Sequence, residues 1–182
     1  MLHKHAHLTE KELNGQDFED SIFDHCIFSG DIRFVGFTNC KFKNCDFSTA
    51  LFNTTNFTNC SFPDSKLNNI DFNDISITNC DFSGALMENC IFQKKKKFNL
   101  KSCVFNKTNL TRSAFVFCDL GNLFFTDCDL TGVVFERCDL KSTDFQNAKL
   151  DGTSFEDCHI ESTVLDVNGF ISFGSSKGFI LK

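Results

Sequence analysis

Eleven cysteines are the first candidates for chemistry in this 182-residue chain, because thiolates can bind metals, form disulfides or act as nucleophiles. They are Cys26, Cys40, Cys45, Cys60, Cys80, Cys90, Cys103, Cys118, Cys128, Cys138 and Cys158. A zinc site or a disulfide framework would require close pairs such as Cys-x-x-Cys, and no such pair occurs. Cys40 and Cys45, for example, are five residues apart, which favours a structural role.

Histidines and aspartates could offer metal-binding or acid–base chemistry. His3, His5 and His7 could hold a metal loosely, but they precede the regular part of the chain, where we expect a frayed end. His25 and His159 are isolated from other candidate ligands, and the many aspartates recur at one fixed position of a repeat. No Ser/His/Asp set, phosphate-binding loop or nucleotide motif stands apart from that repeat. We therefore predict a protein that is not an enzyme and binds no cofactor or metal.

The repeat has a period of five residues and is marked by a bulky apolar residue, which we call the centre. Centres occupy every fifth position from Phe37 to Phe92 and from Leu100 to Phe170. A second residue, usually small, lies two positions before each centre, and every cysteine occupies that position. Asp or Asn is frequent immediately before the centre. We interpret the cysteines as small apolar core residues, a role that free cysteine fills well.

A five-residue period fits neither an α-helix nor a long flat strand, so the chain must turn once per unit. The small residue and the centre, two positions apart, can point inward together while the other three residues face outward. A longer repeat of 20 residues indicates four sides per coil, in Thr38-Asn39-Cys40, Thr58-Asn59-Cys60 and Thr78-Asn79-Cys80. The sequence therefore predicts an all-β, right-handed quadrilateral parallel β-helix of about seven to eight coils over residues 16–170.

Two further patterns predict contacts between stacked coils. The outward Asn39, Asn59 and Asn79 should hydrogen-bond to one another along the stack as an amide ladder. From Leu100 to Phe155 the centres alternate between Leu and Phe. With four sides per coil, this alternation should place Phe on Phe and Leu on Leu.

The repeated units resemble those of pentapeptide-repeat proteins over residues 16 to about 170, which implies a right-handed quadrilateral β-helix. Members of that family commonly dimerise through their C-terminal ends. Some segments are similar to the quinolone-resistance (Qnr) type, namely Ser21-Ile22-Phe23-Asp24-His25-Cys26-Ile27-Phe28-Ser29-Gly30, Phe37-Thr38-Asn39-Cys40-Lys41-Phe42 and Lys107-Thr108-Asn109-Leu110. This second resemblance implies a DNA mimic that binds DNA gyrase and topoisomerase IV and counters quinolones.

The charge of the chain argues against direct binding of nucleic acid, because neutralising phosphates needs a basic surface. The formal net charge is −6 and the sequence pI is about 5.3. Residues 1–92 contain 13 acidic and 6 basic residues, so the negative charge lies mainly in the first half. The carboxylates do not concentrate on one predicted side, which weakens the DNA-mimic interpretation. The candidate acidic surface comprises Asp31, Asp46, Asp64, Asp71, Asp74, Asp81 and Glu88.

Two observations bear on location. No apolar run approaches the roughly 18 residues that a membrane span requires, and residues 1–12 contain no apolar signal region. Because the fold tolerates many reduced thiols, we expect a soluble protein of the cytoplasm that makes no membrane contact.

The five-residue register slips twice. One residue is missing within 28–32, which a tightened corner near Gly30 could absorb, and three extra residues lie within 92–100. Because four adjacent ammonium groups repel one another, we expect an exposed, mobile bulge there. It is either a solubilising corner or a basic contact for an acidic partner or a phosphate, and Qnr-type proteins often have longer loops at comparable places. The candidate loop contact comprises Lys94, Lys95, Lys96 and Lys97.

Both ends of the stack need caps, because terminal coils expose apolar side chains and unpaired strand edges. Residues 1–15 should form a tail and one helical turn, with Thr9 and Glu12 at capping-box spacing. Residues 171–182 abandon the period and should act as a lid or pair with a second chain, although no helical dimerisation module is recognisable. The candidate C-terminal residues are Phe170, Ile171, Phe173, Phe179, Ile180 and Leu181.

One predicted side of the coil carries outward apolar residues. Ile91, Ala114 and Val134 should stack directly, with Phe117 nearby. Such a patch is usually an interface, unless the bulge or a terminal segment covers it. It supports an alternative to topoisomerase binding, namely a scaffold that docks another partner or its own copy. The candidate interface comprises Phe34, Leu51, Ile91, Ala114, Val116, Phe117 and Val134.

Overall fold

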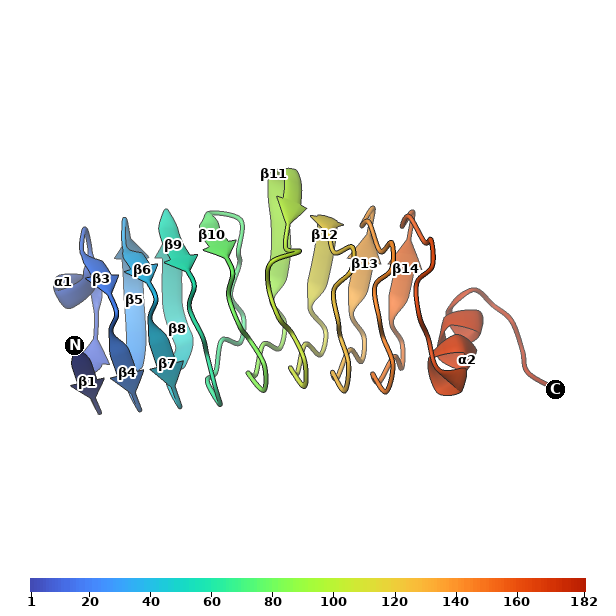
Figure 1. Cartoon of the computed structure of the whole chain (residues 1–182), viewed down its shortest axis with the longest axis horizontal. Helices are drawn as coiled ribbons and strands as arrows, with labels where there is room; N and C mark the ends of the chain where they lie inside the picture. The colour runs from blue at the N-terminus through green and yellow to red at the C-terminus, as the bar shows by residue number, and fades with distance from the viewer.

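Square coils stacked along one axis make up nearly the whole chain, with a helix at each end (Figure 1). The computed structural model describes all 182 residues. Four parallel sheets and a series of isolated parallel bridges join neighbouring coils, which confirms the predicted quadrilateral β-helix, with about 8 turns. The elements are β1 (Leu2–Lys4), β2 (His7–Leu8), α1 (Glu10–Leu13), β3 (Asp17–Glu19), β4 (Ile22–Asp24), β5 (Ile27–Arg33), β6 (Gly36–Thr38), β7 (Lys41–Lys43), β8 (Asp46–Asn53), β9 (Thr55–Thr58), β10 (Ile75–Thr78), β11 (Ile91–Asn99), β12 (Ala114–Asp119), β13 (Val134–Glu136), β14 (Ser154–Glu156) and α2 (Val167–Ser176).

Coils and sides are named as follows. Coils 1 to 8 comprise residues 1–20, 21–39, 40–59, 60–79, 80–102, 103–122, 123–142 and 143–162. Each coil has four sides, because residues 20 positions apart pair in neighbouring coils, as Phe57 and Ile77 do in β9 and β10. The first side contains Phe23, Phe42 and Phe62, the second Phe28, Phe47 and Leu67, the third Phe52, Phe72 and Phe92, and the fourth Phe37, Phe57 and Ile77.

The inward positions form one column-shaped core of 47 buried hydrophobic residues. Its aromatic rings stack from coil to coil, with centroids 4.4 Å apart for Phe92 and Phe115 and 5.5 Å for Phe105 and Phe125. This arrangement confirms the predicted like-on-like stacking. Every cysteine is buried except Cys158, which is partly buried, so the thiols are core residues as predicted. Burying each Phe side chain contributes roughly 1.5–3 kcal/mol, which makes this column the main source of stability.

Most corners are made by the residue two positions after the centre, which there adopts a left-handed backbone conformation. Asn59 has a φ of 53° and Gly84 has a φ of 74°. Asn, Asp and Gly tolerate this region, which explains why they are frequent there. The residue before the centre supports the same turn, since Asp81 Oδ1 accepts the backbone N–H of Ser83 at 2.9 Å. The frequent aspartates therefore have a structural role.

The N-terminal segment forms the first coil. β1 pairs with β4 so that His3 lies opposite Phe23, and the two rings stack with centroids 4.7 Å apart. The expectation of a frayed end is therefore wrong, because His3 and Leu8 occupy centre positions in the same five-residue register. The helical turn α1 has the predicted capping box, in which Thr9 and Glu12 satisfy each other's backbone N–H groups.

Both register slips lie within long strands. At the first, β5 and β8 continue through the corner, and Ile27 and Ser29 pair with Asp46 and Thr49, so β8 contains one extra residue. This bulge absorbs the missing residue near Gly30. At the second, the lysine-rich segment is the middle of β11, where the pairing with β12 shifts between residues 93 and 98.

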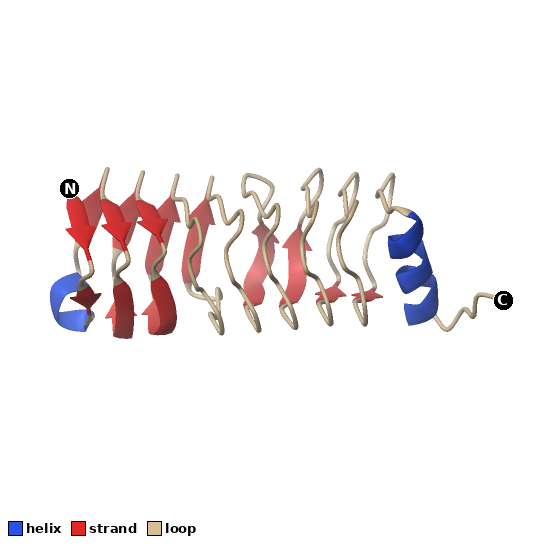
Figure 2. Ribbon diagram, turned by 90° about the horizontal axis from the view of Figure 1, so that it is seen from below, coloured by secondary structure: helices blue, strands red, loops and turns tan.

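The C-terminal end is capped by α2, which lies across the last coil (Figure 2). Asp166 begins this helix, and its carboxylate accepts the backbone N–H of Gly169 at 2.7 Å. Phe173 packs edge-on against Phe155, with ring centroids 5.6 Å apart. The sequence showed no recognisable helical module here, and the structure adds the helix α2. Neither helix is long and apolar enough to cross a membrane.

Candidate functional site

The interior thiols do not form a reactive site. The Cys60 thiol donates to the carbonyl oxygens of Phe37 and Thr58 at 3.3 and 3.4 Å. Burial raises the pKa of Cys128 to about 12. Interaction with the Cys60 side chain lowers the pKa of Cys40 to about 7, yet Cys40 is only 2% exposed. The structure also contains no group of three or more His, Cys, Asp or Glu side chains arranged to hold a metal ion.

Five of the seven candidate interface residues lie together on the third side, and we call them the β12 patch. Ile91 pairs with Ala114, and Ala114 pairs with Val134, so the three residues stack directly in successive coils, as predicted. Val116 and Phe117 follow in β12, and the Phe117 side chain is 40% exposed. Helix α2 packs against β14, the strand beyond the patch, and Ile91 is 42% exposed. The patch is therefore open on the surface of coils 5 to 7.

The other two candidate interface residues lie apart from the β12 patch. Phe34 is on coil 2 and Leu51 is on coil 3, and both are strongly exposed, at 66% and 70%. The exposed Asp71 and Asp74 of coil 4 lie between them and the β12 patch along the third side. The structure therefore divides the predicted interface into two surfaces.

The lysine-rich segment is the middle of strand β11, and its pairing with β12 is irregular between residues 93 and 98, where an exposed bulge was expected. The Lys97 ammonium folds back along the rod, and Nζ lies 3.8 Å from an Asp119 carboxylate oxygen and 3.1 Å from one of Asp139. The Lys94 ammonium lies 4.5 Å from the centroid of the Phe98 ring, and partial burial lowers its pKa. Lys95 and Lys96 are exposed and make no ion pair. They are therefore the basic groups of this segment that are available to a partner.

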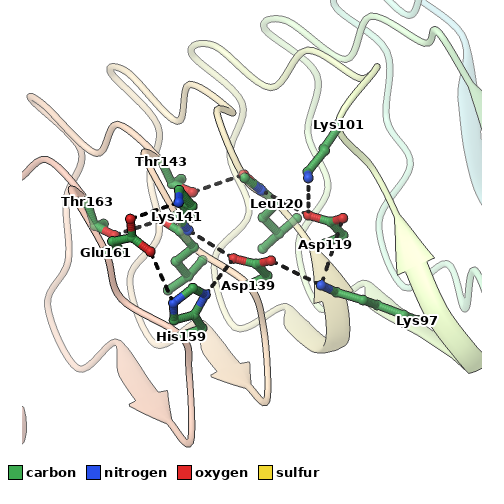
Figure 3. A network of polar contacts seen from close by, with 12 residues as sticks. Lys97, Lys101, Asp119, Leu120, Asp139, Lys141, Thr143, His159, Glu161 and Thr163 are labelled. Carbon is green, nitrogen blue, oxygen red and sulfur yellow. Dashed lines mark hydrogen bonds and ion pairs between the residues drawn. The ribbon is translucent and has the colours of Figure 1, made fainter.

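A network of charged side chains continues from Lys97 along the fourth side of coils 5 to 8 (Figure 3). Lys101 Nζ lies 3.0 Å from Asp119, and His159 Nδ1 lies 3.2 Å from Asp139. Sequence reasoning missed this network, although the acidic residues are 20 positions apart and therefore had to be neighbours. Single exposed ion pairs contribute little to stability, and this network joins side chains of four successive coils.

The electrostatics of Asp139 reflect this network. Partial burial acts to raise its pKa, but the Lys141 backbone N–H and the Lys97 and His159 side chains outweigh burial and lower the pKa to about 2. The other ring nitrogen of His159 lies 3.5 Å from Glu161, whose carboxylate is 2.8 Å from Lys141 Nζ. Acidic and basic side chains are thus interspersed here, so this surface is neither uniformly acidic nor uniformly basic.

The candidate acidic residues do not form one surface, because they occupy three different sides. They are Asp64 and Asp81 on the first side, Asp46 and Glu88 on the second, and Asp31, Asp71 and Asp74 on the third. Asp31 forms an ion pair with Arg33, and Glu88 accepts a hydrogen bond from Asn109 at 3.0 Å. A partner facing one side would therefore meet only two or three of these carboxylates.

The C-terminal candidates gather around α2. A cavity of about 250 Å³ lies between α2 and the last coils, with Phe170 and Phe173 in its wall. Ile171, Phe179, Ile180 and Leu181 are exposed, along with one face of Phe170. These side chains form an open apolar end surface.

The repeats of this chain match those of known protein families. The sequence matches the family described as "Pentapeptide repeats (8 copies)" over residues 35–68 and 55–93, and "Pentapeptide repeat region" over residues 98–168. No protein of curated function matches the sequence.

Solved structures with a similar fold include two forms of QnrB1, a plasmid-mediated fluoroquinolone resistance protein. A trypsin-treated form is 20% identical with a TM-score of 0.65, covering 100% of this chain and 98% of the other. Full-length QnrB1 is also 20% identical, with a TM-score of 0.60 over 98% of this chain and 100% of the other. The coil geometry is the right-handed quadrilateral β-helix of these structures, as predicted. Together with the family matches, which span most of the coils, this shows that the chain belongs to the pentapeptide-repeat family.

Proposed function

We propose that this protein acts without catalysis by binding a type II topoisomerase, DNA gyrase or topoisomerase IV, and protects that enzyme from quinolones. The observation that carries the proposal is the end-to-end correspondence with QnrB1, which spans 100% of this chain and 98% of the other. At 20% identity the correspondence concerns the fold, so the partner itself must be tested directly.

The closed interior limits where such binding can occur. Phe rings fill the coils, so only outward side chains can meet a partner. Lys95 and Lys96 are exposed at mid-rod without an ion pair, and the β12 patch lies beside them on the third side. The acidic residues of coils 2 to 5 could occupy part of a DNA-binding groove, but they are spread over three sides. We therefore place the contact on the third side around β11, with the acidic residues in a supporting role.

The test is a DNA supercoiling assay with purified gyrase, with and without a fluoroquinolone. The wild-type protein should restore supercoiling in the presence of the drug. Reversing the two free lysines (Lys95→Glu with Lys96→Glu) should abolish this protection, whereas the control reversal of Lys41→Glu with Lys43→Glu on the first side should not. If the wild-type protein neither alters supercoiling nor restores it, topoisomerase binding is ruled out.

A second candidate function is that of an interaction scaffold that docks a different protein, or its own copy, on the β12 patch. The observation that favours it is the backbone of Phe117, whose φ is 54° at a corner that usually takes Asn, Asp or Gly. A bulky residue there costs roughly 1–2 kcal/mol, which a contact made by the exposed ring could offset. The Phe117→Asp and Val134→Asp double variant should lose association without unfolding. Unchanged sedimentation and partner capture would refute this function.

We also propose a homodimer through the C-terminal end. Phe179, Ile180 and Leu181 are each at least 74% exposed, and a second α2 surface would bury them. Ile180→Asp with Leu181→Asp should halve the mass measured by sedimentation equilibrium. A monomeric wild-type protein would exclude the dimer.

We propose a cytoplasmic location because the cysteines of the core are free thiols. Unpaired thiols are maintained in reducing compartments, and every cysteine of the chain is free. Cell fractionation with thiol labelling under denaturing conditions tests this, and recovery in an oxidising compartment would contradict it.

A further inference from the structure

A buried side-chain nitrogen without a hydrogen-bond partner lies in the first coil. It is Nε2 of His3, which no group of the protein contacts as a donor or acceptor. The His3 ring stacks on Phe23 with centroids 4.7 Å apart and packs edge-to-face with Phe18 at 6.0 Å. All centres from Phe18 onward are Phe, Leu, Ile or Met. The imidazole is therefore a polar, titratable ring at the end of an apolar column.

A neutral imidazole fits this place better than a protonated one. The neutral ring carries a proton on one nitrogen only, so Nε2 can be the nitrogen without one. The imidazolium ring donates from both nitrogens, and its Nε2–H would be buried without an acceptor, which costs free energy in addition to burying the charge. Burial, together with the terminal ammonium of Met1, accordingly lowers the pKa of His3. Uptake of a proton therefore opposes the packing of this ring.

No carboxylate near His3 offsets this cost. The Asp24 carboxylate of β4 is engaged by His25 at 2.8 Å and by Lys4 at 3.7 Å. The Cys26 thiol donates to the His3 carbonyl oxygen at 3.5 Å, and the His5 ring faces His25 with centroids 5.2 Å apart. The other ionisable side chains of the surrounding elements are exposed and form no ion pair with the ring, namely Asp17 and Glu19 of β3, Asp20, His7 of β2, and Glu10, Lys11 and Glu12 of α1.

Residues 1–8 are attached to the rod on one side only. β1 pairs with β4 alone and β2 with β5 alone, and Met1 and Leu2 are 81% and 57% exposed. The following segment is anchored separately, because Leu13 of α1 is fully buried. Next to it, the Asn14 side chain donates to Asp31 O at 3.1 Å and accepts the backbone N–H of Arg33 at 2.7 Å. Residues 1–8 can therefore detach ahead of α1 without disturbing the helix.

We propose that residues 1–8 are a proton-sensitive cap, which detaches when His3 is protonated at mildly acidic pH while α1 and coils 2 to 8 stay folded. Detachment uncovers the Phe23 ring and frees the edge of β4, so the length of the ordered rod depends on pH. Because the folded-state pKa lies below the ordinary value of 6.5, the cap has its full stability above pH 6.5 and loses stability as the pH falls below it. The proposal is independent of topoisomerase binding.

Amide hydrogen exchange at about pH 7.5 and about pH 5 tests the cap, with each rate divided by the intrinsic rate at that pH. The His5 N–H, which donates to Asp24 O at 3.0 Å, should lose protection at the lower pH by up to roughly thirtyfold, since each pH unit below 6.5 costs at most tenfold. The Asp20 N–H donates to Thr38 O at 3.0 Å from the equivalent corner after α1, and it should stay protected. Equal losses at both amides, or no loss at His5, would overturn the proposal.

Variants of single histidines identify the group that responds to acid. His3→Phe keeps an aromatic ring on Phe23 and removes the titration, so the His5 N–H should stay protected at about pH 5. His3→Leu, which also suits a centre position, should behave in the same way and replaces the Phe variant if that one misfolds. The matched control is His7→Gln, at an exposed histidine whose Nε2 lies 2.7 Å from Ser29 Oγ, and it should show the full acid loss. The same loss in wild type and in both His3 variants would assign the effect to another group and overturn the proposal.

A nuclear magnetic resonance titration of the histidine rings gives a second readout. The His3 ring signals, identified by their absence in His3→Phe, should report a pKa below 6.5. A pKa of 6.5 or higher would show that the column accommodates the protonated ring, and the cap would then not respond to acid through His3.

Discussion

Lys97 Nζ lies 3.1 Å from a carboxylate oxygen of Asp139, a residue 42 positions later in the chain and two coils further along the rod. This contact bends the last lysine of the β11 insertion back onto the fourth side. It leaves Lys95 and Lys96 as the projecting charges, and it helps to lower the pKa of Asp139 to about 2.

The lowered pKa predicts a specific acid sensitivity. Because the folded-state pKa lies below the ordinary value of 3.8, the ionised carboxylate stabilises the fold above that value, and this contribution is lost as the pH falls toward 2. Asp139→Asn should therefore lose less unfolding free energy than wild type between about pH 5 and pH 2.5. Urea titrations at both pH values measure this difference. Asp74→Asn, which removes an unpaired carboxylate, is the control, and equal losses in Asp139→Asn and wild type would contradict the prediction.

Core packing predicts a large difference between two adjacent residues. The Phe125 ring is fully buried and stacks on Phe105 and Phe145, with centroids 5.5 and 5.4 Å apart. Phe125→Ala should reduce the free energy of unfolding by roughly 3–5 kcal/mol, because it leaves a cavity in mid-column. Thr126→Ala, on the outward face, should have little effect in the same chemical denaturation. Similar losses for both would be incompatible with the register.

The corner at Gly30 predicts a cost set by backbone strain. Its φ is 84°, and an added Cβ would meet the carboxylate at the end of the exposed, flexible Glu10 side chain, which can move aside. Gly84 has a similar φ of 74° and open space around it. Gly30→Ala and Gly84→Ala should therefore each lose roughly 1–2 kcal/mol by thermal denaturation. A larger loss in Gly30→Ala that Glu10→Ala removes would contradict this expectation, because it would show that Glu10 does not move aside.

The amide ladder predicts a further difference between corners. The Asn59 side chain donates to Asn39 at 3.0 Å and accepts from Asn79 at 3.1 Å. Asn44 occupies an equivalent left-handed corner, and its side chain makes no hydrogen bond. Glycine keeps the corner and removes the amide, so Asn59→Gly should destabilise the protein by about 1 kcal/mol more than Asn44→Gly. Equal unfolding free energies for the two variants would mean that the ladder is energetically neutral.

Much of the fold could be predicted because the five-residue period is a local pattern that every coil repeats. The inward cysteines, the Phe and Leu columns, and the bonded Asn59 ladder all follow from counting positions, and the structure confirms them. The capping box at Thr9 could be predicted for the same reason, since it depends only on residues within one turn.

The errors arose where the pattern contains an unexpected residue type or ends. His3 occupies a centre position, but imidazole is not apolar, so the first coil was interpreted as a frayed tail. At the other end, Phe170 keeps the five-residue spacing but lies in α2, a helix that begins after Asp166 and packs Phe173 on Phe155 of the last coil. In both places the neighbouring coil, rather than local preference, determines the structure.

The sequence by itself determined which side chains face inward and how many residues form a coil, because both depend on spacing along the chain. Only the tertiary structure decided where coils fail to pair and which outward residues meet. Residues 50–53 of β8 pair with β5, but no backbone hydrogen bond joins them to residues 70–74 of coil 4, although the five-residue spacing is regular there. Lys97 reaches Asp139 because stacking brings residues two coils apart within the length of one lysine side chain.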